Sequence, residues 1–168
     1  MKHIATITDQ EILGTSGLSA AKPRITARAI VKNSAGQYAL MHFGKFDLYS
    51  LPGGGVDEGE SLLHALEREI WEETGCTCDT ITPLGFIEEN RAHADYTQIS
   101  YYYIVHTNSP CLKPAFTDEE QKNHTSVHWC SLEEVCARIG EPQHTTAQRK
   151  YLQARDMAAL AEYGKLLG

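Results

Sequence analysis

The stretch from Leu51 to Cys76 constrains the fold of this 168-residue chain more than any other part of it. Three consecutive glycines open the stretch, and a segment rich in glutamates follows. At about 100° per residue, residues 61–74 gather apolar side chains on one face, as an amphipathic helix does. These side chains are Leu62, Ala65, Leu66 and Ile70. Because Gly75 comes next, and glycine commonly follows the end of a helix, the sequence predicts one helix entered through a glycine loop.

Three glutamates of this predicted helix lie on or beside its apolar stripe. Glu69 and Glu73 project over the stripe and Glu72 lies at its edge, because residues three and four apart share a helix face. Like charges at that spacing disfavour an isolated helix by roughly 0.2–0.5 kcal/mol, and burial adds to the cost. A solvated acidic face is the ordinary alternative. The third carboxylate and the preceding glycines instead favour a site for a hard divalent cation such as Mg²⁺.

Glu60 and Arg68 complete a recognisable motif with these residues. The sequence from Gly54 to Cys76 resembles the Nudix box, G-x5-E-x7-R-E-U-x-E-E-x-G-U, in which U is bulky and apolar. Every fixed position is filled, and Cys76 is the one soft match. The resemblance implies an α/β fold of the Nudix type, an α/β/α sandwich with a mixed β-sheet. It also implies a magnesium-dependent hydrolase of nucleoside diphosphates linked to another moiety.

The resemblance assigns roles to residues in and beside the box. The carboxylates of Glu69, Glu72 and Glu73 and the carbonyl of Gly53 would hold Mg²⁺, with Mn²⁺ as a substitute because both suit oxygen ligands. Glu69 either completes the metal site or accepts the proton of the attacking water. We expect Arg68 to orient the carboxylate of Glu72 by charge-assisted hydrogen bonds.

Substrate contacts are expected around the glycine loop. Gly54 and Gly55 allow a close approach of the backbone to a ligand. Arg28, on one face of a predicted strand, is a candidate to bind phosphate, with a solvated strand arginine as the alternative. Tyr49 would stack on a base or cover the edge of the core. Selectivity for one nucleotide would depend on side chains outside the box, with these candidates: Phe46, Tyr49, Arg91 and Tyr96.

Some Nudix enzymes take a further catalytic carboxylate from a late strand or loop. The candidates in this chain are Glu88, Glu89, Asp118, Glu119 and Glu120. His106 stands at the end of a predicted late strand, where certain relatives have glutamate. For residues 118–120, a solvated acidic loop is the alternative.

The rest of the chain predicts strands on both sides of the central helix in sequence. Alternation and turn residues indicate strands over 3–8, 24–32, 37–43, 81–90, 98–106 and 124–130, and loops over 9–23 and 107–123. A capping box at Ser131 predicts a helix to about residue 139, and an amphipathic pattern predicts a closing helix over 146–167. Residues 1–23 would pack on, or link to, a Nudix hydrolase domain formed by residues 24–168.

Charge and composition restrict the partners and the location. A net charge of −7 disfavours nucleic-acid polymers and anionic membranes, so we expect a small phosphorylated nucleotide. No run approaches 18 consecutive apolar residues, and the N-terminus lacks the features of a signal peptide. We therefore expect a cytoplasmic protein, and the Nudix resemblance makes a homodimer an option.

The cysteines give no signal for a cross-link or a zinc site. Their number is odd and no C-x-x-C pair occurs. The five are Cys76, Cys78, Cys111, Cys130 and Cys136. We expect reduced, partly buried thiols, as in a cytosolic protein.

Two other function classes fit a Nudix-type fold. One is a module that senses a nucleotide without cleaving it, and the intact box disfavours it. The other is an isomerase, and nothing outside the box suggests isoprenoid chemistry.

Overall fold

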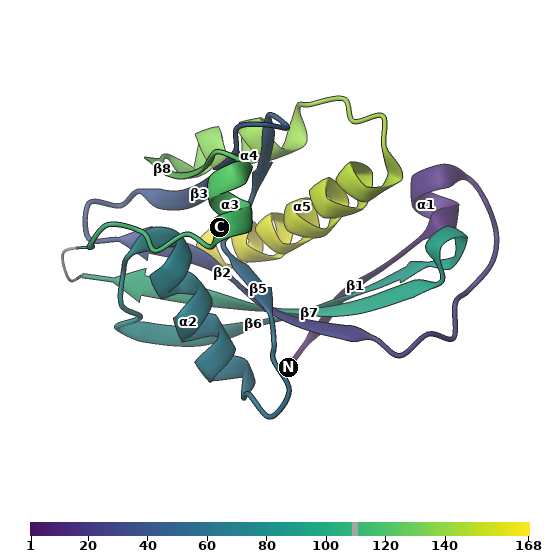
Figure 1. Ribbon diagram of the computed structural model, residues 1–168, viewed down its shortest axis with the longest axis horizontal. Helices are drawn as coiled ribbons and strands as arrows, with labels where there is room; N and C mark the ends of the chain where they lie inside the picture. The colour runs from purple at the N-terminus through teal and green to yellow at the C-terminus, as the bar shows by residue number, and fades with distance from the viewer. Residues whose placement is uncertain (109–110) are drawn as a thin grey trace.

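The computed structural model describes residues 1–108 and 111–168. Within these residues, the chain forms an eight-stranded sheet with helices on both faces (Figure 1). The elements in chain order are β1 (His3–Thr8), α1 (Asp9–Leu13), β2 (Arg24–Asn33), β3 (Tyr38–Phe43), β4 (Leu48–Ser50), β5 (Gly53–Gly55), α2 (Leu62–Thr74), β6 (Thr80–Arg91), η1 (Ala92–Ala94), β7 (Tyr96–Thr107), α3 (Asp118–Lys122), β8 (Thr125–Cys130), α4 (Leu132–Gly140) and α5 (Ala147–Leu167).

The sheet is mixed, as predicted. Its strand order is β1-β6-β7-β2-β3-β4, with β5 paired to β2 and β8 paired to β3. The pairs β1·β6 and β2·β7 are parallel, and the other pairs are antiparallel. Strand β2 lies at the centre, where it contacts β7 along its whole length and still pairs with the glycines of β5.

Two apolar cores lie on opposite faces of this sheet. The alternation expected for β2 is confirmed: Ala27, Ala29 and Val31 pack with the buried face of α2, whereas Ile30 belongs to the core beneath α4 and α5. Arg28 shares the face of Ile30, because side chains two apart on a strand point the same way. Helix α2 therefore covers one face, α4 and α5 cover the other, and the α/β/α sandwich is confirmed.

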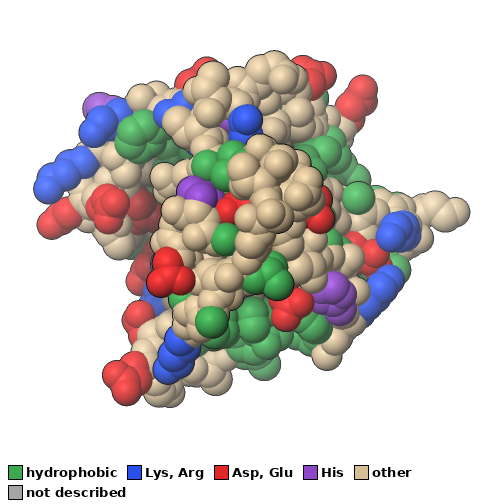
Figure 2. Space-filling view, turned by 90° about the vertical axis from the view of Figure 1, so that its right-hand side faces the viewer, with side chains coloured by type: hydrophobic (Ala, Val, Ile, Leu, Met, Phe, Trp, Pro, Cys, Tyr) green, Lys and Arg blue, Asp and Glu red, His purple; other side chains and the backbone are tan. Residues whose placement is uncertain are grey.

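The N-terminal residues are part of this sandwich. Strand β1 pairs with β6, and Asp9 then begins a short helix inside a segment that we predicted to be a loop. The Gly, Ser and Ala content of residues 9–23 favoured a loop at this place. In the structure, a capping contact starts the helix: the carboxylate of Glu11 accepts the Thr8 N–H at 2.8 Å. Helix α1 lies beside the β6–β7 turn (Figure 1). Figure 2 looks onto this end and shows acidic and basic side chains mixed over its surface.

Three further segments differ from the prediction. Leu48–Ser50 and Gly53–Gly55 form strands β4 and β5, which are short enough to lack an alternating pattern. Asp118–Lys122 forms helix α3 within the predicted loop, where the side chain of Thr117 accepts the N–H of Glu120. No helix among residues 1–108 and 111–168 is both long and apolar enough to cross a membrane.

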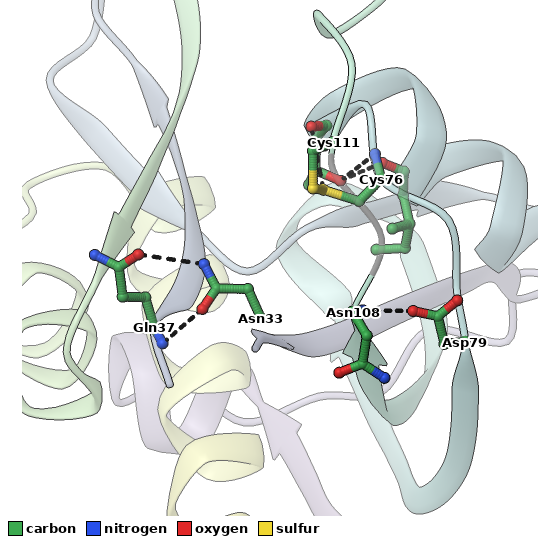
Figure 3. Close-up of a disulfide and its surroundings, with 8 residues drawn as sticks. Asn33, Gln37, Cys76, Asp79, Asn108 and Cys111 are labelled. Atoms are coloured by element: carbon green, nitrogen blue, oxygen red, sulfur yellow. Dashed lines mark hydrogen bonds between the residues drawn. A yellow bond between two sulfur atoms is a disulfide. The ribbon is translucent and has the colours of Figure 1, made fainter. Parts of the chain in front are cut away.

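Cys76 and Cys111 form a disulfide, which corrects the expectation that these thiols are reduced (Figure 3). Their Cα atoms lie 4.3 Å apart across a sequence separation of 35. The chain after β7 returns to the C-terminal end of α2, where the Leu112 N–H donates to the Gly75 carbonyl at 2.8 Å. Sequence spacing could not reveal this approach, because it depends on the path of β6 and β7. The remaining cysteines are free thiols: Cys78, Cys130 and Cys136.

Candidate active site

Helix α2 is fixed at both ends by local signals. At its start, the Ser61 hydroxyl accepts the N–H of His64 at 3.2 Å. At its end, Gly75 adopts a φ of 71° and donates its N–H to the Trp71 carbonyl at 2.9 Å. A β-carbon at Gly75 would stand 2.0 Å from the Leu112 carbonyl oxygen, so only glycine fits there. The helix predicted over residues 61–74 is therefore confirmed at Leu62–Thr74.

The glycine loop lies directly against this helix. Gly53 has a φ of 125°, and a β-carbon there would stand 2.3 Å from the carbonyl oxygen of Ala27. At Gly54, a β-carbon would stand 2.5 Å from the carboxyl group of Glu69. The first glycine is thus required by the neighbouring strand, and the second leaves room for a glutamate of the box.

Glu73 connects the helix to the loop from a buried position. Its side chain accepts the backbone N–H of Gly53 at 2.7 Å, and the residue is only 4% exposed. Burial raises the pKa of Glu73 well above its ordinary value, although the Gly53 hydrogen bond and the charge of Arg28 act in the opposite direction. Burial likewise raises the pKa of Glu69 against the influence of Arg68. Two neighbouring carboxylates are therefore held where negative charge is unfavourable.

Arg68 links the loop, the helix start and two glutamates. Its Nε and Nη2 each donate to the carboxylate of Glu60 at 2.9 Å, and Nη2 also donates to the Gly55 carbonyl at 3.0 Å. Its Nη1 lies 2.8 Å from Glu69 and 3.5 Å from Glu72. The hydrogen bonds from Arg68 lower the pKa of Glu60 to about 2. The arginine thus contacts Glu72 as expected, but its shorter contacts are to Glu60 and Glu69.

The chemistry of these groups suits a hard divalent cation. Glu69, Glu72 and Glu73 supply carboxylate oxygens on one side of a helix, and the adjoining loop supplies backbone carbonyls, the donors that Mg²⁺ and Mn²⁺ prefer. Among the described residues, no three His, Cys, Asp or Glu side chains already converge as a metal cage. The Arg68 guanidinium contacts both Glu69 and Glu72 instead. The residues fit the ion by donor type and by the charge that it would neutralise.

Two of the predicted substrate residues have protein partners. Arg28 is half-buried, and its Nη1 donates to the Leu51 carbonyl at 3.1 Å. Burial lowers the pKa of Arg28. Tyr49 stacks on His42 with ring centroids 4.4 Å apart, and the guanidinium of Arg138 lies 5.4 Å from its ring.

The other candidates for selectivity lie in two separate places. Phe46 lines a cavity of about 480 Å³, where the Arg149 guanidinium lies 5.8 Å from its ring. The cavity is lined by Phe43, Phe46, Leu48, Glu119, Asn123, Thr146, Gln148, Arg149 and Leu152. The guanidinium of Arg91 instead lies over the ring of Tyr96, 5.0 Å from its centroid, beside the β6–β7 turn. Of the four selectivity candidates, Phe46 is therefore the one placed in this cavity.

The additional carboxylates also separate by position. Glu89 is 1% exposed and binds Arg91 at 2.6 Å and Gln98 at 2.7 Å. Glu88 accepts the hydroxyl of Thr6 at 3.2 Å. Glu120 caps α3, and its charge contributes to the raised pKa of Glu73. His106 and Asp118 are exposed.

Sequence reasoning missed Asp156, which reaches the glycine loop from the opposite face of the sheet. Its Oδ2 accepts the backbone N–H of Leu51 at 2.9 Å, across 105 residues of sequence. No motif marks Asp156, so the fold alone reveals this contact.

Comparisons with known proteins place the chain among similar sequences and folds. The model of the NUDIX domain matches residues 22–154. The "8-oxo-dGDP phosphatase NUDT18" of Danio rerio is 29% identical over 104 residues, which cover 60% of this chain and 30% of that protein. The chain spans less than half the length of the curated relatives it matches.

Solved structures share the fold at lower identity. A NUDIX hydrolase from Nitrosomonas europaea superposes with a TM-score of 0.65 at 21% identity, covering 86% of this chain and 90% of that one. The NUDIX domain of Shewanella oneidensis NrtR, in complex with ADP ribose, gives a TM-score of 0.63 at 19% identity, covering 96% and 100%. At these identities the likeness establishes the fold.

Proposed function

The chain belongs to the Nudix hydrolase family, and from this premise we propose a magnesium-dependent pyrophosphohydrolase that cleaves a diphosphate linkage in a small nucleotide. The substrate classes are nucleoside triphosphates, nucleotide sugars, ADP-ribose and dinucleoside polyphosphates. The name of the Danio rerio relative adds an oxidised guanine nucleotide to this range. One observation carries the proposal: the Gly53 N–H of the glycine loop donates to Glu73, and Arg68 joins the Gly55 carbonyl of the same loop to Glu69.

The proposed reaction is attack of water on phosphorus with cleavage of the P–O bond of the anhydride. A bound Mg²⁺ would neutralise the diphosphate oxygens and lower the pKa of a water ligand. Glu72 and Glu73 would hold the ion with the Gly53 carbonyl, while Glu69 either completes this set or accepts the water's proton on its carboxylate. Arg68 keeps Glu69 beside Gly54, and the missing side chains of Gly54 and Gly55 allow close approach of a phosphate.

We assign the nucleoside part of the substrate to the cavity that contains Phe46. Its lining combines aromatic surface with the amides of Asn123 and Gln148, which suits a base that must stack and form hydrogen bonds. Helix α3 supports the placement of this cavity beside the reacting groups. Glu119 of that helix lines the cavity, and the charge of the next residue, Glu120, helps to raise the pKa of Glu73. Arg28 remains a proposed contact for phosphate.

The proposed enzyme acts in the cytoplasm on a soluble nucleotide and not on a nucleic-acid polymer or a membrane. The net charge of −7 supports this choice of partner. The Cys76–Cys111 disulfide weighs against the location, because disulfides persist mainly in oxidising compartments. Counting thiols by mass spectrometry in protein taken from its own cells tests the location. Residues 24–168 form the proposed hydrolase domain with 1–23 packed on it, and light scattering tests the proposed homodimer.

Incubation with a panel of nucleotides, with and without Mg²⁺, tests the function. We expect at least one member to yield two phosphorylated products, separated by ion-exchange chromatography, and the reaction to stop in excess EDTA. Turnover that persists in EDTA would contradict the metal requirement. Tight binding of a nucleotide without cleavage would instead favour a sensing module.

A further inference from the structure

The backbone of Leu51 is held from both sides by charged side chains. Its N–H donates to Oδ2 of Asp156 at 2.9 Å, and its carbonyl accepts Nη1 of Arg28 at 3.1 Å. Leu51 is 1% exposed, so water does not compete for either group. A peptide group held by two hydrogen bonds to charged partners has a well-defined orientation, because such bonds are stronger than neutral ones.

Leu51 lies two residues before Gly53, which contacts the candidate metal ligand Glu73. The Pro52 carbonyl accepts the Ala29 N–H at 3.0 Å, and the Gly53 N–H then donates to Glu73 at 2.7 Å. Three consecutive residues are therefore anchored by hydrogen bonds, beginning at Asp156 and ending at Glu73. Because Pro52 restricts its own φ and the conformation of Leu51, a shift of Leu51 is transmitted to Gly53.

Asp156 is itself held in one position. It is 0% exposed, and its Oδ1 accepts the hydroxyl of Tyr102 and Nε of Arg155. With two donors on Oδ1, Oδ2 remains for Leu51. The two oxygens therefore have separate tasks: one joins the carboxylate to its own network, and the other holds the loop.

We propose that Asp156 is a positioning residue for the active site, which acts through Leu51 on the placement of Gly53. The inference rests on the proposed function for the role of Gly53, but the positioning itself is a property of the chain. It assigns a catalytic consequence to the C-terminal helix α5, on the face of the sheet opposite to α2.

Asp156→Asn is the direct test, because three donors converge on Asp156 and asparagine offers one acceptor oxygen. Two matched variants isolate the Leu51 contact. Tyr102→Phe removes a donor from Oδ1 of the same carboxylate and leaves the Leu51 bond in place. Glu162→Gln alters another buried carboxylate of α5, which is bound to Lys2 and Lys165 and has no contact with the loop among the described residues.

The first readout is amide hydrogen exchange by NMR without substrate or metal. In Asp156→Asn we expect exchange at Leu51 and Gly53 to accelerate at least tenfold relative to amides of α2. We expect no such selective change in Tyr102→Phe or Glu162→Gln. The second readout is the Mg²⁺ concentration that gives half of the maximal rate, which should rise at least fivefold in Asp156→Asn at an unchanged nucleotide KM.

The proposal is overturned if amide exchange in Asp156→Asn matches wild type at Leu51 and Gly53, or if it rises equally at all amides. If that variant does not fold, Asp156→Glu keeps the charge opposite Arg155 and displaces the carboxylate, so the same selective exchange is expected. If neither variant folds while Tyr102→Phe does, Asp156 serves only the stability of the fold. A wild-type protein that cleaves no nucleotide refutes the proposed function, whereas the exchange data still decide the positioning.

Discussion

The carboxylate of Glu73 accepts the backbone N–H of Gly53, so a glutamate of the Nudix box holds the glycine loop against its own helix. The same side chain is buried and lies close enough to Glu69 for the charge of Glu69 to help raise its pKa. A group in this position contributes to the shape of the site and carries an electrostatic cost. Carboxylates with this combination cluster at functional sites, which is why the first prediction concerns Glu73.

Glu73→Gln should abolish most turnover while the metal-free protein stays folded. Glutamine still accepts the Gly53 N–H through its amide oxygen, and it removes the repulsion with Glu69. We expect turnover to fall at least 100-fold, or about 3 kcal/mol of transition-state stabilisation, with the free energy of unfolding without metal equal to wild type or slightly higher. Steady-state kinetics and urea denaturation measure the two quantities.

Glu67→Gln is the matched control on the same helix. Glu67 is exposed and, at about 100° per residue, lies roughly 120° around the helix axis from Glu73. Its change should alter stability by no more than about 0.5 kcal/mol and leave turnover near wild type. Wild-type rates in both variants would show that this helix does not hold the metal.

Arg68→Lys should lower kcat more than it raises KM. Lysine keeps the charge but loses the planar fork that binds Glu60 twice and reaches Gly55 and Glu69. We expect a loss of roughly tenfold or more in kcat, because misplaced ligands weaken the transition state more than substrate binding. Glu60→Gln should reproduce part of the effect. A large rise in KM with kcat intact would make Arg68 a substrate contact.

Reduction of the Cys76–Cys111 disulfide should destabilise the protein by roughly 2–4 kcal/mol, the usual range for such a cross-link. Thermal unfolding with and without a phosphine reductant measures the change. Cys111→Ser should start from the lower stability and show no further response to reductant. Cys136→Ser, which alters a free thiol of α4, should respond to reductant as wild type does. An equal response in Cys111→Ser and wild type would contradict the assignment.

Asp9 should make the fold sensitive to acid. Burial alone would raise its pKa, but hydrogen bonds from Tyr151 and from the backbone and ring of His93 prevail and lower the pKa of Asp9 below its ordinary 3.8. A carboxylate whose pKa is lowered by folding stabilises the fold at pH values above its ordinary pKa. This contribution is lost as the pH falls through the lower pKa of the folded state. The stability difference between wild type and Asp9→Asn should therefore shrink on acidification below about pH 4. Urea denaturation between pH 3 and 7 measures it, and a constant difference would contradict the assignment.

The parts of this molecule that could be predicted from sequence are those set by local signals. Ser61 and Gly75 mark the ends of α2 through contacts within a few residues, and the alternation of β2 follows from its two buried faces. The closing helix predicted over 146–167 is observed at Ala147–Leu167. The spacing of the box likewise placed three glutamates beside a glycine loop.

Helices α1 and α3 were missed although their caps are local, whereas the other missed features depend on contacts between distant parts of the chain. The Asp156–Leu51 bond spans 105 residues, and the disulfide joins cysteines 35 residues apart. Neither leaves a periodic trace, because a single partner at a single position carries each contact. Strand β5 exists because three glycines fit against β2, which their own strand propensity would not predict.

The cross-link between Cys76 and Cys111 also closes a covalent ring that contains β6, the exposed η1 turn and β7. A protease that cuts the chain once within this ring leaves both fragments attached through sulfur. The nicked molecule would migrate as one band on a denaturing gel without reductant and as two bands with it. The hairpin can therefore lose its peptide continuity at the turn while both fragments remain joined in one molecule.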